Sequence, residues 1–248
     1  MFKIREDLIY IMAGHSKWHS IKHKKGANDA KRGKVFTKHA RLVTLAAKNG
    51  ADPDLNALLR AAIDNAKAAN VPNDNIQRAI DKASGANGDT QMFEMTYEAY
   101  GPNGVAFLID AITDNKNRTI TSVRTILNKN GGSLGESGSV SYMFKLKGVI
   151  VGQGALDDDL SLDILDLGAQ DIDQSDEVFV VTTDPSSMLN VKNAIENQNL
   201  TINSAEVAKV ADIELEISDS AIQEKILKLI SKLEDDDDIT DVYTNCNI

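Results

Sequence analysis

The 248-residue sequence contains a single cysteine and no long apolar run. Cys246 cannot close an internal disulfide, which fits a reducing, cytoplasmic setting. No stretch approaches the roughly 18–20 consecutive apolar residues that a membrane-spanning helix needs, so we expect no membrane partner. The hydrophobic fraction of 42% and the charged fraction of 26% are ordinary for a folded protein. The length predicts two or three domains.

Residue sets that carry catalysis are also missing. No nucleophile–base pair or pair of carboxylates stands out by its spacing, so we expect no enzyme, no small-molecule substrate and no cofactor. His15, His19 and His23 recur every fourth residue and would share a helix face, which raises zinc as an alternative. No cysteine or carboxylate lies nearby to complete a ligand set, and the surrounding lysines repel a cation. We therefore expect no metal.

Positive charge is scarce in most of the chain and is concentrated near its start. The formal net charge is −10, yet residues 13–90 hold fourteen Lys or Arg against seven Asp or Glu. Residues 91–248 hold eleven against twenty-eight. Lys and Arg neutralise phosphates and release counterions, so this segregation predicts a polyanionic partner, namely nucleic acid. A merely solvated charged face is the alternative, but general basicity cannot explain the cluster in an acidic chain.

The densest part of this positive charge is residues 13–41, which we call the basic segment. It is too polar up to about residue 34 to bury a face, and we expect an arm of short helical turns there. Trp18 offers a face on which a splayed base could stack. The predicted nucleic-acid contacts are Lys17, Trp18, Lys22, His23, Lys24, Lys25, Lys31, Arg32, Lys34, Lys38 and Arg41.

Apolar positions at helical spacing predict a small helical bundle around and after the end of the basic segment. A first helix runs from residue 35 to the stop signal Asn49-Gly50. Asp52-Pro53 predicts the N-cap and the first residue of a second helix, with Leu55 and Leu58 on its apolar face. A third helix follows Val71-Pro72, and a linker-like stretch comes after it.

Beyond residue 88 the pattern becomes mixed α/β. The predicted elements of the middle part are strands at 95–100, 105–112 and 140–144 and a helix at 118–130. Residues 148–211 then alternate strands and helices as a small ferredoxin-like sandwich does. A helix at 221–233 and a strand at 239–244 are left over, which suggests that the chain returns to complete the middle domain.

The predicted fold class is therefore α+β and multidomain. An N-terminal helical bundle is followed by two mixed α/β sandwich domains, and the third, ferredoxin-like domain is inserted in the second. Met12 would make a natural start, so we expect the residues before it to be a poorly ordered leader. The predicted division is a leader at 1–11, a basic helical domain at 12–88, a discontinuous α/β domain at 89–147 and 212–248, and an inserted domain at 148–211.

Two loops could bind ions, and each has a plainer alternative. Residues 131–139 (GGSLGESGS) could hold a phosphate through backbone N–H groups. They lack the lysine of a P-loop and follow a helix, so a simple connection is favoured. Residues 235–238, four aspartates in a row, could bind Mg²⁺. Their place after the end of a helix favours an exposed, self-repelling turn.

Several motifs in the same order resemble the YebC/PmpR family. They are MAGHSKW at residues 12–18, KRGKVFTK at 31–38, DNIQRAI at 74–80 and TDNKNRT at 113–119. The similarity extends from Met12 nearly to the end of the chain. It implies a three-domain protein with the third domain inserted in the second, and a cytoplasmic transcriptional regulator that binds DNA.

The same resemblance leaves a second target open. Some bacterial members, and the mitochondrial translational activator of cytochrome oxidase, instead act on the ribosome and help it through difficult sequences such as proline runs. A strongly acidic body would repel an extended duplex, which favours contact with rRNA. Leu42 after Arg41, Asn73 and Ala99 each depart from the family pattern and leave the subfamily open. The oligomeric state stays open too.

Overall fold

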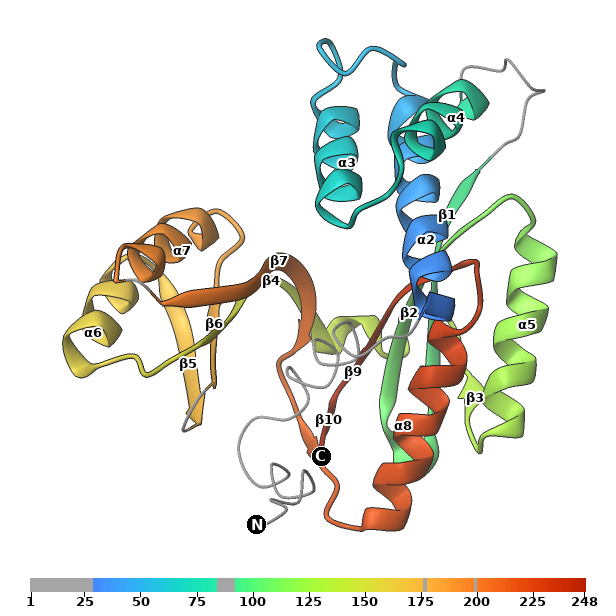
Figure 1. Ribbon diagram of the computed structural model, residues 1–248. Helices are drawn as coiled ribbons and strands as arrows, with labels where there is room; N and C mark the ends of the chain where they lie inside the picture. Colours follow the sequence, from blue (N-terminus) through green and yellow to red (C-terminus); the bar gives the residue numbers. More distant parts are fainter. Residues whose placement is uncertain (1–28, 84–91, 176–177, 199) are drawn as a thin grey trace, which may run out of the picture. The chain divides into compact units, whose positions relative to one another are not determined.

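The computed structural model describes residues 29–83, 92–175, 178–198 and 200–248 (Figure 1). The predicted leader and most of the basic segment lie outside these residues. The described chain forms two compact units. The first unit contains the described residues up to Ser141 together with Ser218–Thr244, and the second contains Tyr142–Ile217 and Asn245–Ile248. The finer division into three domains stays a prediction.

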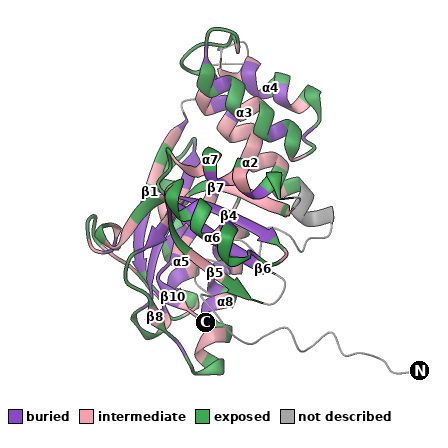
Figure 2. Ribbon diagram, turned by 90° about the vertical axis from the view of Figure 1, so that its left-hand side faces the viewer, coloured by how far each residue is buried: buried purple, intermediate pink, exposed green. Residues whose placement is uncertain are grey.

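Three helices form the beginning of the first unit: α2 (Asp29–Ala47), α3 (Ala57–Ala68) and α4 (Asn73–Ala83). They pack around a small apolar core, with exposed residues on the outward faces of α3 and α4, whereas α2 is mostly of intermediate burial (Figure 2). The buried residues of this core are Val43, Ala47, Leu59, Ala66, Val71, Ile76, Ala79 and Ile80. The predicted three-helix arrangement is confirmed for these residues.

The start of α3 differs from the prediction at Asp52-Pro53. Asn56 is the N-cap: its side chain accepts from the backbone N–H of Leu59 and donates to the carbonyls of Ala46 and Gly50. One amide thereby caps α3 and satisfies carbonyls at the end of α2, which an aspartate cannot do because it has no N–H. The helix starts four residues later than Pro53, and Leu55 and Leu58 are 87% and 66% exposed instead of buried.

The first unit continues as an antiparallel sheet of order β3-β1-β2-β9. Its strands are β1 (Phe93–Tyr100), β2 (Ala106–Thr113), β3 (Ser133–Leu134) and β9 (Ile239–Thr244). Two helices, α5 (Lys116–Lys129) and α8 (Ser220–Glu234), pack against this sheet and against each other. The leftover final helix and strand therefore do return to the sheet begun near residue 93, as predicted.

The second unit has the element order β-α-β-β-α-β and an antiparallel sheet of order β5-β6-β4-β7. Its elements are β4 (Phe144–Gln153), α6 (Asp158–Asp166), β5 (Ala169–Ser175), β6 (Val178–Thr183), α7 (Met188–Asn197) and β7 (Thr201–Ala211). A short parallel pair, β8 (Leu215–Glu216) and β10 (Cys246–Asn247), belongs to the same unit. Both helices bury apolar residues in one core with Ile150 and Phe179.

One strand prediction in this region is wrong, and one strand was not predicted. The strand predicted at 140–144 is replaced by a short 3-10 turn, η2 (Ser141–Met143), and β4 begins only at Phe144. Strand β5 escaped prediction because its sequence AQDIDQS is polar, as suits an edge strand with only one neighbour. The described elements still confirm a mixed α+β protein with antiparallel sheets. None of its described helices has both the length and the apolar character needed to cross a membrane.

Candidate nucleic-acid interface

Helix α2 carries the last of the predicted nucleic-acid contacts. Lys34, Lys38 and Arg41 are spaced four and three residues apart, so they share one face of the helix. Lys31 and Arg32 belong to α2 by their backbone. The remaining predicted contacts, Lys17, Trp18, Lys22, His23, Lys24 and Lys25, lie outside the described residues.

Each of the three side chains on this face ends on a different carboxylate. The carboxylates come from residues 235–241, which we call the acidic turn and which comprise the link after α8 and the first three residues of β9. The ion pairs are Lys34–Asp235, Lys38–Asp241 at 2.8 Å and Arg41–Asp238 at 2.8 Å. This face of α2 is therefore neutralised within the chain.

Burial increases along these pairs. The Lys34 and Asp235 side chains are 37% and 46% exposed, whereas those of Arg41 and Asp238 are 18% and 6% exposed. Arg41 also donates to the backbone carbonyl of Ile112 at the end of β2. Lys34 is thus the most open of the three to a polyanion, and Arg41 instead fastens α2 to the sheet.

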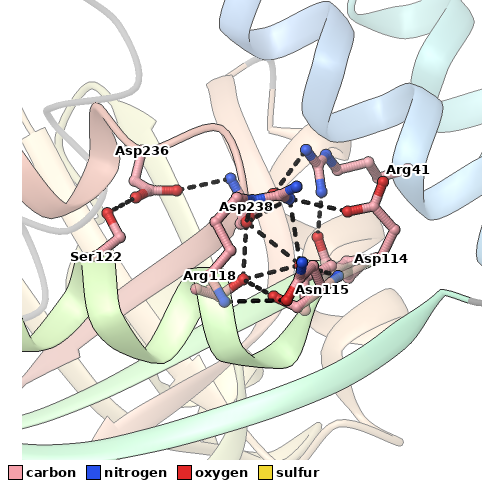
Figure 3. Close-up of polar contacts among 10 residues, drawn as sticks. Arg41, Asp114, Asn115, Arg118, Ser122, Asp236 and Asp238 are labelled. Carbon is pink, nitrogen blue, oxygen red and sulfur yellow. Dashed lines mark hydrogen bonds and ion pairs between the residues drawn. The ribbon is translucent and has the colours of Figure 1, made fainter.

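Asp238 is the centre of a polar cluster at the start of α5 (Figure 3). Besides Arg41, its carboxylate accepts from Arg118 Nη2 at 2.8 Å and from Thr119 Oγ1 at 2.7 Å. Burial alone would raise the pKa of Asp238, but the hydrogen bonds from Arg118 and Thr119 and the charges of Arg41 and Arg118 hold the pKa below its ordinary value. Asp238 therefore stays ionised between two arginines.

The expectation of an exposed, self-repelling turn is wrong at Asp238. Two arginines from distant parts of the chain neutralise this side chain, and Asp236 accepts a hydrogen bond from Ser122 on α5 (Figure 3). A signal was present in the motif TDNKNRT, because it places an arginine in the first turn of a helix directly after a buried strand. Across the described ranges, no three His, Cys, Asp or Glu side chains are grouped so as to hold a metal ion.

The end of the glycine-rich loop at 131–139 binds an anion together with the two residues that follow it, but that anion is a side chain of the same protein. The Glu98 carboxylate accepts from the backbone N–H groups of Gly138 at 2.7 Å, Val140 at 2.6 Å and Ser141 at 2.8 Å. Burial raises the pKa of Glu98, and these N–H groups together lower the pKa below its usual range. Within the loop, the N–H of Gly138 is therefore occupied by an internal carboxylate, which agrees with the plainer interpretation of a structural connection.

The chain is similar to known proteins along most of its length. Residues 16–86 match a family model described as the TACO1/YebC protein N-terminal domain, and residues 92–246 match one described as the TACO1/YebC second and third domain. A Listeria innocua protein named probable transcriptional regulatory protein lin1570 is 49% identical over 96% of this chain and 100% of its own length. The probable transcriptional regulatory protein YrbC of Bacillus subtilis is 48% identical over 94% of this chain and 99% of its own.

A solved structure is similar as well. The crystal structure of a conserved hypothetical protein, Aq1575 from Aquifex aeolicus, superposes with a TM-score of 0.77 at 39% sequence identity. The match covers 92% of this chain and 95% of that one. The sequence relatives and this solved structure are each similar to the chain over more than nine tenths of its length.

Proposed function

Because this chain belongs to the TACO1/YebC family, we propose that it is a non-enzymatic, nucleic-acid-binding regulator of gene expression that acts on DNA in the cytoplasm. The names of its relatives, probable transcriptional regulatory proteins, support a regulatory role. The observation that carries the proposal is the segregation of charge. A net-acidic chain keeps fourteen of its Lys and Arg residues between residues 13 and 90.

The proposed contacts differ in how free they are to bind phosphate. The residues from Lys17 to Arg32 provide most of the backbone contacts in this proposal. Lys34 and Lys38 extend the surface where a phosphate replaces the carboxylate that now pairs with each of them. Arg41 takes the role of an anchor, because it is largely buried and is held by Asp238.

The proposal extends to the architecture of the acidic part. The β-α-β-β-α-β order and the sheet order β5-β6-β4-β7 support a ferredoxin-like domain. We assign it to residues 148–211, inserted in a second domain made of 89–147 and 212–248. A basic helical domain at 12–88 then completes three domains.

A translation factor that contacts rRNA and relieves stalling, for example at proline runs, is the second candidate. The charge of residues 91–248, eleven basic against twenty-eight acidic residues, favours it. Such a body repels a long duplex, whereas a short basic segment can enter an rRNA-lined site with the body held away from the phosphates. Both candidates use the same contacts in the basic segment.

The proposal is tested with the full chain and the triple variant Lys22→Glu/Lys24→Glu/Lys25→Glu. Binding to a labelled DNA duplex and to an RNA hairpin is measured between 50 and 200 mM salt. Over this range a protein that binds through phosphate contacts loses much of its affinity. The matched control, Lys145→Glu/Lys192→Glu/Lys209→Glu, makes the same change in net charge within the second unit. We expect the first variant to lose affinity and salt dependence and the control to retain both.

Sedimentation of cell lysate through a sucrose gradient separates the two candidates. If the wild-type protein migrates with ribosomes and the triple variant does not, the result supports the translation factor. A protein that stays at the top of the gradient but shifts a promoter fragment against excess competitor supports the DNA-binding regulator. Equal binding by the wild type and the triple variant would show that the basic segment is not the contact site.

A further inference from the structure

A second concentration of positive charge lies inside the acidic part of the chain. Helices α5 and α8 hold seven of the eleven Lys and Arg residues found between residues 91 and 248, but only two of the twenty-eight Asp and Glu residues. The rest of that part holds four basic residues against twenty-six acidic ones. Helix α5 contains no acidic residue. General composition therefore does not explain the charge of this helix pair.

The two helices lie side by side over the sheet of the first unit (Figure 1). They run in opposite directions, because Ser122 in the first half of α5 contacts Asp236, just beyond the end of α8. Their inward faces are apolar and buried, with Val123 and Leu127 on α5 and Leu229 and others on α8. Their polar side chains are therefore directed away from the core.

All seven basic side chains of this helix pair are exposed, and five of them have neither a ring contact nor an ion pair shorter than 3.5 Å within the described residues. These five are Arg124 and Lys129 on α5 and Lys225, Lys228 and Lys232 on α8, and we call them the basic helix face. The three lysines are three and four residues apart, so they form one stripe about 10 Å long on α8. The remaining two basic residues differ: Lys116 lies over the ring of Phe93, and Arg118 is bound by Asp238.

The basic helix face has few internal partners. Within the part of the chain that the structure describes, the side chains of Arg124, Lys129, Lys225 and Lys228 form no hydrogen bond or ion pair, and Lys232 has one contact, at 3.5 Å, with Asp235. The hydroxyls of Thr121 and Thr125, on the exposed side of α5, donate to carbonyls of their own helix. The acidic residues of this helix pair are Glu224 and Glu234 on α8, and Asp235 follows directly after the helix.

We propose that the basic helix face is a second contact surface for the phosphate backbone of nucleic acid. This inference rests on the proposed function and assigns it a second site. Each strand of a duplex carries one phosphate per about 3.4 Å of helix axis, so the lysine stripe on α8 would lie within reach of more than one phosphate. Unlike Lys34 and Lys38, four of these cations give up no internal ion pair when a phosphate binds. The acidic body thereby gains one face that attracts a polyanion.

The test uses the full chain and the double variant Lys225→Glu/Lys228→Glu. Both side chains are exposed on α8, and glutamate has nearly the same helix propensity as lysine, so the variant keeps the fold. The matched control, Lys192→Glu/Lys209→Glu, changes the net charge equally in the second unit. Affinity for a labelled 24-base-pair duplex is measured against salt concentration. We expect the slope of log Kobs against log salt to fall by about 2 in the double variant, near 0.9 per lost contact, and to stay unchanged in the control.

The possible outcomes separate this inference from the proposed function. If the salt slope of duplex binding is unchanged in the double variant, or falls equally in the control, the basic helix face is not a second contact surface. The basic segment is tested separately, by its own triple variant. A wild-type chain that binds neither the duplex nor an RNA hairpin overturns both proposals. The wild type could also bind phosphatidylglycerol vesicles. If the double variant loses this binding but still binds the duplex normally, the basic helix face binds anionic lipid, and the inference is overturned.

Discussion

Arg41 and Asp238, almost 200 residues apart in the sequence, form a 2.8 Å ion pair that is largely buried. Arg41 comes from helix α2 and Asp238 from the acidic turn, so the pair joins the basic end of the bundle to the sheet that follows it. Arg118 shares the same carboxylate. One aspartate therefore holds two arginines from two helices.

Replacing Asp238 should lower the stability of the fold. In Asp238→Asn, Arg41 and Arg118 lose the charge that compensates them, and breaking such a pair costs about 3 kcal/mol of unfolding free energy. Urea denaturation followed by circular dichroism measures the change. The control is Asp237→Asn, which removes the same charge from an exposed neighbour and should shift stability by less than about 0.5 kcal/mol. If both variants lower the free energy of unfolding equally, the two arginines do not depend on Asp238 for stability.

The three ion pairs along α2 should differ in their contribution to stability. Lys34→Gln removes an exposed pair, and such pairs contribute roughly 0.2–1 kcal/mol. Arg41→Gln leaves Asp238 with one fewer cation and also removes the donor to Ile112, so we expect a loss of about 2–3 kcal/mol. Thermal and urea unfolding of both variants in the same buffer test this order. A larger loss in Lys34→Gln than in Arg41→Gln would contradict it.

The Glu98 carboxylate should be essential to the glycine-rich loop. Glu98→Gln keeps the shape but leaves one neutral oxygen for three backbone N–H groups, so we expect a loss of about 2 kcal/mol. Glu136→Gln, in the exposed part of the same loop, is the control and should be close to neutral. Hydrogen exchange at Gly138 and Val140 adds a local measurement, because these amides should exchange faster only in the Glu98 variant.

Stability should fall in acid because of Asp238 and Glu98. Both carboxyl groups have a folded-state pKa below the ordinary value, so each stabilises the fold above its unfolded pKa of about 4. The contribution is lost as the pH falls from about 4 through the still lower folded pKa. Urea midpoints measured from pH 7 to pH 3 should drop mainly below pH 5. In Glu98→Gln the urea midpoint should fall less steeply with decreasing pH than in the wild type. If the two curves of midpoint against pH are parallel, Glu98 does not contribute to the acid sensitivity.

The sequence alone determined the features that depend on local pattern. Periodic apolar residues located the main helices, α5 and α8 among them, because a helix buries one stripe. The strand at Ile239–Thr244 was predicted at its observed bounds. Charge segregation is likewise a property of the linear chain, so the basic segment was visible before any fold was known, and its role remains a proposal.

Only the tertiary structure decided which charges remain available to a partner. No local pattern indicates that Lys34, Lys38 and Arg41 meet the acidic turn, because their partners lie about 200 residues away. Glu98 likewise binds the N–H of Gly138, at the end of the loop that resembled a phosphate cradle. Helices α5 and α8, which together carry seven basic residues, come to lie side by side only when the chain has folded. Long-range electrostatics depends on proximity in space, and the linear order of residues does not specify that proximity.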